Sequence, residues 1–379
     1  MSATGSVTPS PKPGFDRTAL VEALLPPLLA LLIALVLGDL LILAFGQSPA
    51  MVYRLLIDGT WGIPYGLGQL LYKATTLSFT GLAVAVGLRA GLFNIGAESQ
   101  LAAGAFAAAI AGLALPHGTP WLLAVPLCLA AAAFGGALVG ALAGFLKARF
   151  GAHEVIVTIM LNFVVLALLN WAVAAKLHEP ETLHTPSIHA GGLARLADSF
   201  EKLHGSASNW TVLVAVLAAV GVAVLLFRTR FGYDLRAAGL QPDAAEAGGI
   251  KVNRVWVSAM ALAGALAGLG GTNFVLGYKG YYEDGLAGGA GFMGIAVALV
   301  GRNHPFGVLL ASLLFATLSQ GGLAIHAAVP KQLVEVLQAT VILAMAATAP
   351  EVRRLLRNAV LPRRGTASAG RAGGSGSGA

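Results

Sequence analysis

The sequence predicts an all-α fold, a polytopic membrane protein with about ten transmembrane helices, and three observations support this. First, 57% of the 379 residues are hydrophobic and only 11% are charged, whereas soluble domains carry about 25% charged residues. Second, apolar runs of the ~20 residues that a bilayer core requires recur along the chain. Third, Lys and Arg gather in alternate connections between those runs. The net charge of +7 is therefore typical of membrane topology and does not indicate a nucleic-acid partner.

Ten apolar segments are candidates for spans. They cover residues 19–43, 66–88, 95–115, 121–146, 154–176, 209–228, 252–276, 288–301, 305–325 and 331–349. We expect a kink in the first at Pro26-Pro27, because proline removes a helical hydrogen bond. The eighth segment is short and rich in glycine, so we expect a broken or partial span.

The basic residues predict the orientation. They fall into five groups, at residue 89, at 147–149, at 228–254, at 302 and in the tail, and an even number of spans separates each group from the next. Positive loops face the cytoplasm, which places both termini there and residues 177–208 in an outer loop. The domains expected are a disordered cytoplasmic arm (1–18), a transmembrane domain (19–349) and a basic low-complexity tail (350–379).

Neither a disulfide nor a metal site is expected. The single cysteine, Cys128, lies in an apolar run, so an internal disulfide is impossible. The outer loop contains His178, Glu179, Glu181, His184 and His189, but their spacing matches no helical or CxxC-type ligand pattern. We expect a solvated loop, no metal and no cofactor bound by this chain.

A polar island, residues 89–100 with the sequence RAGLFNIGAESQ, interrupts two apolar runs. Within a bilayer, such a break persists only where protein or water covers the backbone. Gly91 can relax a turn, Asn94 can cap a new helix, and Glu98 falls in the positive first turn of that helix. Two interpretations stay open: a tight turn with a capped helix start, or a functional site.

Glu154, Thr158 and Asn162 recur every four residues on the fifth segment, an arc of about 80° on a helix. Such a polar stripe should face the bundle interior. We expect Asn162 to line a solute pathway. The other expected members of that pathway are Phe93, Asn94, Glu98 and Gln100. The alternative is a set of interhelical hydrogen bonds that only hold the spans together.

Small residues also form two faces that predict close helix packing. Gly136, Gly140 and Gly144 share one face of the fourth segment, and Gly264 and Gly268 share one face of the seventh. Small residues let helix backbones approach closely in lipid. For Gly264 the alternative is a small residue with no packing role.

The loop at 229–251 contains a helix signal. Pro242 suits the first turn of a short helix, Asp243 favours its positive end, and Gly248-Gly249 would terminate it. We expect a short helix on the cytoplasmic face. The alternative is a long loop with one helical turn.

These segments resemble those of a known family. Asp243-Ala244-Ala245-x-x-x-Gly249 resembles the signature by which ABC importer permeases dock onto their ATPases. Residues 89–100 are similar to the RAGLFNIGAEGQ block of permeases in the branched-chain amino acid, simple sugar and nucleoside group, with Ser99 in place of the usual glycine. Residues 153–162, 239–250 and 291–305 resemble further blocks of the nucleoside and sugar branch. Asp243 stands where glutamate is often found, which keeps the charge.

The resemblance implies a permease subunit in a bacterial inner membrane, with a fold like that of the vitamin B12 importer permease. It implies three partners: a second permease subunit that is often a different chain, a duplicated-domain ATPase that binds the ATP, and an extracytoplasmic substrate-binding lipoprotein. The chain lacks a phosphate-binding loop motif, so we do not expect an enzyme. The residues that match the docking blocks are Gly239, Pro242, Asp243, Ala244, Ala245 and Gly249.

The expected solute is neutral and hydrogen-bonding: a nucleoside is the first expectation, and a simple sugar is the alternative. Polar residues near the spans are mainly amides and hydroxyls, and Lys73 is the main basic exception. A carboxylate or phosphate would therefore lack fixed countercharges. The competing class is an ion-coupled secondary transporter that uses Glu98 as its carrier, since acidic residues within spans are usually functional.

Overall fold

The computed structural model describes residues 17–326, 334–340 and 342–344. Most of the arm expected at 1–18 and all of the tail expected at 350–379 lie outside these residues. Asp39–Gln338 forms one compact unit that contains every site discussed below, and α1 before Asp39 belongs to a second unit with Ala339 onwards. The described part is helical and has two isolated β-bridges, His184 with Glu283 and Arg195 with Asn209.

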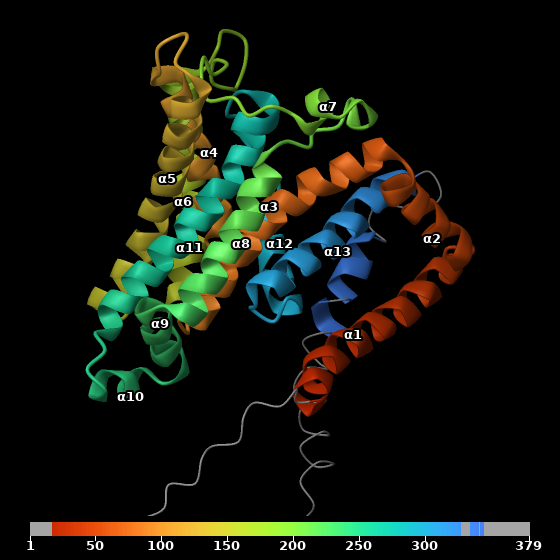
Figure 1. The fold of residues 1–379 in the computed structure, drawn as a ribbon, viewed down its shortest axis with the longest axis horizontal. Helices are drawn as coiled ribbons and strands as arrows, with labels where there is room; N and C mark the ends of the chain where they lie inside the picture. Colours follow the sequence, from red (N-terminus) through yellow and green to blue (C-terminus); the bar gives the residue numbers. More distant parts are fainter. Residues whose placement is uncertain (1–16, 327–333, 341, 345–379) are drawn as a thin grey trace, which may run out of the picture. The chain divides into compact units, whose positions relative to one another are not determined.

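The helices follow one another along the chain (Figure 1). They are α1 (Arg17–Ala44), α2 (Pro49–Ile57), α3 (Pro64–Arg89), α4 (Ala97–Ala114), α5 (Trp121–Phe150), α6 (Glu154–Ala172), α7 (Leu196–Ser199), α8 (Thr211–Arg228), α9 (Arg230–Leu240), α10 (Pro242–Ala247), α11 (Val252–Phe274), α12 (Ala290–Val300) and α13 (Pro305–Ala324). Single π-helical turns extend α2, α6 and α11, at Asp58–Gly62, Val173–Leu177 and Val275–Lys279.

Seven helices of the described part are long and apolar enough to cross a membrane, and an eighth is possible where Leu32–Ala44 and Pro49–Gly62 bend by 112°. The ten spans expected from the sequence are therefore not confirmed in number. The eighth expected segment is α12, only 11 residues long, and the tenth corresponds to the short apolar helix Val334–Ala344. Helix α1 is unbroken through Pro26 and Pro27.

Helix α2 lies where the sequence analysis expected only a connection. Ser48 precedes it and Pro49 occupies its first turn, which is a recognised start signal. With its π-helical extension α2 ends at Gly62, so it is too short to register as an apolar run of span length.

Helix α3 is the central element of the compact unit. It packs against α11, α12 and α13 (Figure 1). Of its most apolar stretch of 18 residues, 83% is buried. The corresponding share for α6 is 11%, so α6 is peripheral and exposes Ile156 and Met160. Thr158 and Asn162 on the same helix are 0% and 4% exposed. The expectation that this part of the polar stripe faces the interior is confirmed.

The glycine faces bring α5 and α11 into backbone contact. A Cβ atom on Gly136 would overlap the carbonyl oxygen of Gly264, and one on Gly268 would overlap that of Ala132. Gly140 approaches the carbonyl oxygen of Met260 in the same way. The expected close packing is confirmed, and the packing role of Gly264 is established.

Candidate functional site

The polar island is a break between two helices. Helix α3 ends at Arg89, Gly91 takes a φ of +73°, and α4 begins at Ala97. A positive φ strains any residue with a Cβ atom, so the expected role of Gly91 in the turn is confirmed. The N-cap residue of α4 is Gly96, not Asn94 as the sequence suggested.

Asn94 and Gln100 form a reciprocal amide pair inside this break. The Nδ2 of Asn94 donates to Oε1 of Gln100 at 2.8 Å, and Nε2 of Gln100 donates to Oδ1 of Asn94 at 3.0 Å. The same Asn94 oxygen accepts the Gly96 N–H at 3.1 Å. The two side chains are 0% and 1% exposed. Their hydrogen bonds are therefore made within the protein and hold the loop in place.

Helix α6 caps the start of α4 from outside. The Oδ1 of Asn162 accepts the backbone N–H of Ser99 at 3.1 Å, and its Nδ2 donates to the carbonyl of Ile95 at 3.0 Å. The Thr158 hydroxyl oxygen lies 3.3 Å from the N–H of Ile95, which donates to it. The first N–H groups of a helix have no partner within it, and here a neighbouring helix supplies one. Glu154 instead pairs with Lys147 at 2.7 Å.

Glu98 holds the start of a second helix. Its Oε1 accepts the N–H of Gly289 at 2.8 Å and its Oε2 accepts the N–H of Gly291 at 2.7 Å. These residues begin α12, whose positive end a carboxylate stabilises. A Cβ atom on Gly291 would overlap the backbone of Glu98, so glycine permits this approach. The glycine-rich start of the eighth segment was visible in the sequence, but its partner was not.

We call Asn94, Glu98, Gln100, Thr158 and Asn162 the polar core. All five are buried and bonded to protein groups around the start of α4. Phe93, the fifth residue expected on a solute pathway, is half-buried and has no part in these bonds. The structure thus brings four of the five expected pathway residues together, and their role in transport stays a prediction.

The expected short helix in the 229–251 loop is α10, with Pro242 and Asp243 in its first turn. It follows α9, whose N-cap Thr229 accepts the N–H of Gly232 at 3.1 Å. Gly248 caps α10, and Gly249 has a φ of +86°.

Gly239 near the end of α9 lies against the polar island. A Cβ atom on Gly239 would overlap the carbonyl oxygen of Arg89, and one on Gly91 would lie 3.1 Å from the Cα of Gly239. The 229–251 loop is therefore in backbone contact with the turn that leads into the polar core.

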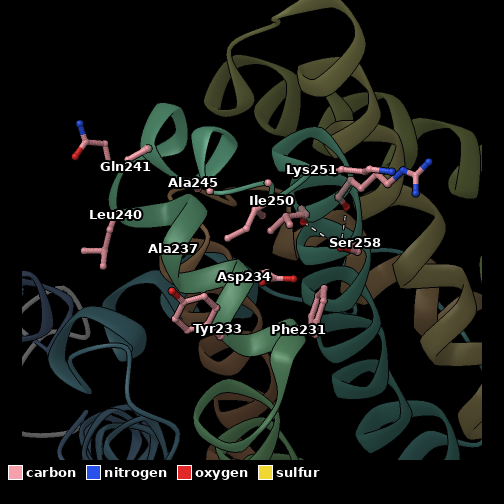
Figure 2. Close-up of a pocket in the computed structure, with 15 residues that line it drawn as sticks. Phe231, Tyr233, Asp234, Ala237, Leu240, Gln241, Ala245, Ile250, Lys251 and Ser258 are labelled. Carbon is pink, nitrogen blue, oxygen red and sulfur yellow. Dashed lines mark hydrogen bonds between the residues drawn. The ribbon is translucent and has the colours of Figure 1, made fainter.

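An open groove of about 950 Å³ separates α9 and α10 from the start of α11 (Figure 2). Asp234, Ile250 and Ser258 line it, as do Ala244, Ala245 and Gly249 of the expected docking residues. Leu240 and Gln241, at the α9–α10 corner, also line this groove, and Leu240 is 88% exposed.

A basic and aromatic cluster lies beside this loop. The guanidinium groups of Arg89 and Arg236 lie 5.8 Å and 5.5 Å from the Phe227 ring centre, and the His304 ring stacks on Phe227 at 5.5 Å. Burial lowers the pKa of His304, and the positive charge of Arg89 lowers it further. No three His, Cys, Asp or Glu side chains of the described residues are grouped so that they could hold a metal ion.

The several long, apolar helices of the described part indicate a multi-pass membrane protein. Residues 66–346 match the family described as branched-chain amino acid transport system / permease component, and the chain belongs to this family.

Three relatives are similar over most of their length. The guanosine ABC transporter permease protein NupP of Bacillus subtilis is 37% identical, covering 86% of this chain and 93% of NupP. The nucleoside ABC transporter permease protein NupB of Lactococcus lactis is 34% identical (84% and 89%). The glucose ABC transporter permease protein TsgB13 of Haloferax volcanii is 33% identical (84% and 85%). No solved structure matches the chain. The family resemblance in the sequence is confirmed, and the chain is a transport component.

Proposed function

We propose that this chain is a membrane-spanning subunit of an ATP-driven importer that carries nucleosides across the bacterial inner membrane. The similarity to NupP and NupB supports the nucleoside. The similarity to TsgB13 makes a simple sugar the second candidate. The observation that carries the mechanism is the backbone contact between Gly239 and the turn at Arg89–Gly91, because it joins an exposed loop to the buried polar core.

In this proposal the 229–251 loop receives the motion of the ATPase. ATP-driven closure presses on α10 at Asp243, α9 moves with it, and Gly239 transmits the displacement to the island before α4. Rigid-body rocking of paired permeases then alternates the open side. Asn162 and Glu98 connect that island to α6 and to α12, so both helices follow.

The remaining assignments follow from the family and the charge pattern. Both termini face the cytoplasm, and the fold is of the vitamin B12 importer type. The partners are a second, different permease subunit, a duplicated-domain ATPase that binds ATP, a substrate-binding lipoprotein and membrane lipid. The chain binds no cofactor and no nucleic acid of its own.

The charges within the spans favour a neutral solute. Glu98 is occupied by two backbone N–H groups, and Lys147 is paired with Glu154. Lys73 is the main cation within the spans, whereas amides and hydroxyls, which can exchange hydrogen bonds with a nucleoside, are more numerous there.

Reconstitution tests the proposal. The permease pair, its ATPase and its binding protein are placed in proteoliposomes, and uptake of labelled guanosine and glucose is measured with ATP and with a protonophore. We expect ATP-dependent guanosine uptake that the protonophore leaves unchanged. Uptake that needs no ATPase and collapses with the protonophore would contradict the proposal and favour the ion-coupled class. ATP-driven uptake of glucose alone would replace the nucleoside by the sugar.

A further inference from the structure

A pocket of about 210 Å³ lies between α3, α12, α13 and the end of α11. We infer that it is a station for the flat, neutral base of a nucleoside on its way through the permease. This inference rests on the proposed function and names a site for it. The side chains that carry the argument are Tyr72, Lys73, Thr76, Phe274, Met293 and Ser319.

The pocket lies far from the cytoplasmic end of α3. Lys73 precedes Arg89, the basic end of α3, by 16 residues, which corresponds to about 24 Å along a helix. Helix α12 has 11 residues, or about half of a bilayer core. Gly288 and Gly289 at its start form part of the pocket wall. A solute in this pocket would therefore be far from the loop expected at the cytoplasmic surface.

Lys73 gives the pocket a hydrogen-bond donor. Its Nζ donates to the Ser319 hydroxyl at 3.1 Å, so α3 and α13 meet across the pocket. A lysine within an apolar span is costly and usually functional. An ammonium group carries three N–H donors, which suits the carbonyl oxygen of a purine or pyrimidine. The pocket's described lining contains no carboxylate, so it offers a cationic solute no acidic side chain to pair with.

Aromatic rings form the second half of the recognition. The Tyr72 ring lies edge-on to Phe274 at 5.7 Å between ring centres and tilted against Tyr278 at 5.4 Å. Phe315 also lines the pocket and is fully buried. Every nucleobase has a π face that stacks on aromatic rings. A free sugar or an aliphatic amino acid has none, so the walls favour the base.

A buried amide network fixes the Tyr72 wall in place. The Nδ2 of Asn273 donates to the Tyr72 carbonyl at 2.9 Å and to the Thr76 hydroxyl at 2.8 Å, and its Oδ1 accepts from Asn209 at 2.9 Å. Asn273 on α11 and Asn209 before α8 do not line the pocket themselves; they hold the α3 residues Tyr72 and Thr76, which do. Such outer bonds hold a binding surface in one geometry.

The pocket wall also reaches the polar core. Gly289 lines the pocket and donates its N–H to Glu98 at 2.8 Å. Glu98 belongs to the polar core. The turn that leads into this core contacts the 229–251 loop through Gly91 and Gly239. A displacement of that loop therefore has a continuous route to the pocket wall, as release of a bound solute would require.

Protection of an introduced cysteine tests the site. In the complete complex carrying Cys128→Ala, Met293→Cys places a thiol in the pocket. Phe292→Cys is the matched control, since the neighbouring Phe292 side chain is 50% exposed and does not line the pocket. Guanosine at about ten times its dissociation constant should slow labelling of the Met293→Cys thiol by about tenfold. It should leave the rate at Phe292→Cys unchanged.

The outcomes separate the site from the proposed function. Equal labelling rates at Met293→Cys, in a complex that imports guanosine, would overturn the pocket and leave the function intact. Protection by glucose or leucine but not by guanosine would overturn the base specificity. A complex that imports no nucleoside would overturn the proposed function itself.

A second variant gives an independent readout. Lys73→Met should lower guanosine uptake by about tenfold through loss of one hydrogen bond from a charged donor, and Lys73→Arg should recover part of it. Co-purification with the ATPase checks that each variant folds. Full uptake by a correctly assembled Lys73→Met complex would contradict the donor role.

Discussion

At the residue scale, the charge of Glu98 stabilises the start of α12, because its two oxygens accept the N–H groups of Gly289 and Gly291. The substitution Glu98→Gln keeps one acceptor but turns an NH₂ group toward a backbone N–H of α12. We expect the free energy of unfolding to fall by about 1–3 kcal/mol, because a charge-assisted bond is lost in a buried site. Thermal unfolding and hydrogen exchange at Gly289 and Gly291 measure this. Glu201→Gln, at an exposed position, is the control. Unchanged stability with abolished uptake would instead indicate a carrier role.

Substitution of Asn162 tests whether the polar core only stabilises the helix packing or also lines the solute pathway. Asn162→Ala removes the side chain that bonds the N–H of Ser99 and the carbonyl of Ile95, at an expected cost of about 1–3 kcal/mol. Asn170→Ala on the same helix is the matched control, because the buried Oδ1 of Asn170 has no hydrogen-bond partner among the described residues. Thermal unfolding of the two variants is compared with uptake. A loss of uptake without a loss of stability at Asn162 would support the pathway.

His304 predicts a pH dependence. Its pKa lies below the ordinary value of 6.5 in the folded protein, because of burial and of Arg89. The unfolded chain therefore binds a proton that the folded chain does not, so stability contributed by neutral His304 is lost as pH falls below about 6.5 toward the folded pKa. We expect the melting temperature to fall more steeply between about pH 7.5 and 5.5 in the wild type than in His304→Phe. Parallel curves would contradict this role.

At the element scale, the contact of α5 with α11 depends on glycine. Gly136→Ala drives a methyl group into the carbonyl of Gly264, and overpacking of this kind costs about 1–3 kcal/mol. Gly221 on α8 is the matched control, because a Cβ atom there meets nothing within 4 Å. Gly221→Ala should be neutral or raise stability by up to about 1 kcal/mol, since alanine favours helix. Thermal unfolding in detergent compares the two, and equal melting temperatures would contradict the packing role.

The elements differ in how far the sequence could predict them. Long apolar runs predicted α3, α5 and α11, and capping residues predicted α10, because both signals are local. Helix α2 was missed, since it is shorter than a span. The face of α6 on which Asn162 lies could be predicted from the four-residue spacing. The hydrogen bonds of Asn162 to the start of α4 could not, because periodicity shows which face a side chain shares but not which residue it contacts.

The same limit applies to Glu98 and Lys73. The sequence placed Glu98 at a positive helix end, and the structure adds a second helix end, 191 residues further along the chain. In the sequence, Lys73 is the main basic residue within a predicted span. Only the packing of α3 against α13 brings it to Ser319 and to a pocket.

At the scale of the whole compact unit, three parts are connected: the 229–251 loop, the polar core and the pocket. Gly91 and Gly239 bring the loop into backbone contact with the turn that leads into the polar core. The Glu98 carboxylate accepts the N–H of Gly289 in the pocket wall. These two connections can therefore be altered one at a time, so docking of the ATPase can be separated from transmission.

Gly239→Val should uncouple the permease without dissociating it. Its side chain would overlap the carbonyl of Arg89 and push α9 away from the polar island, while α10 with Asp243 stays exposed for the ATPase. We expect co-purification with the ATPase and ATP hydrolysis to persist, and uptake per ATP to fall by at least about tenfold, within the range of coupling free energies between sites. Asp243→Arg, in contrast, should lose the ATPase. If Gly239→Val kept normal uptake per ATP, the contact with Arg89 and Gly91 would not be the route of coupling.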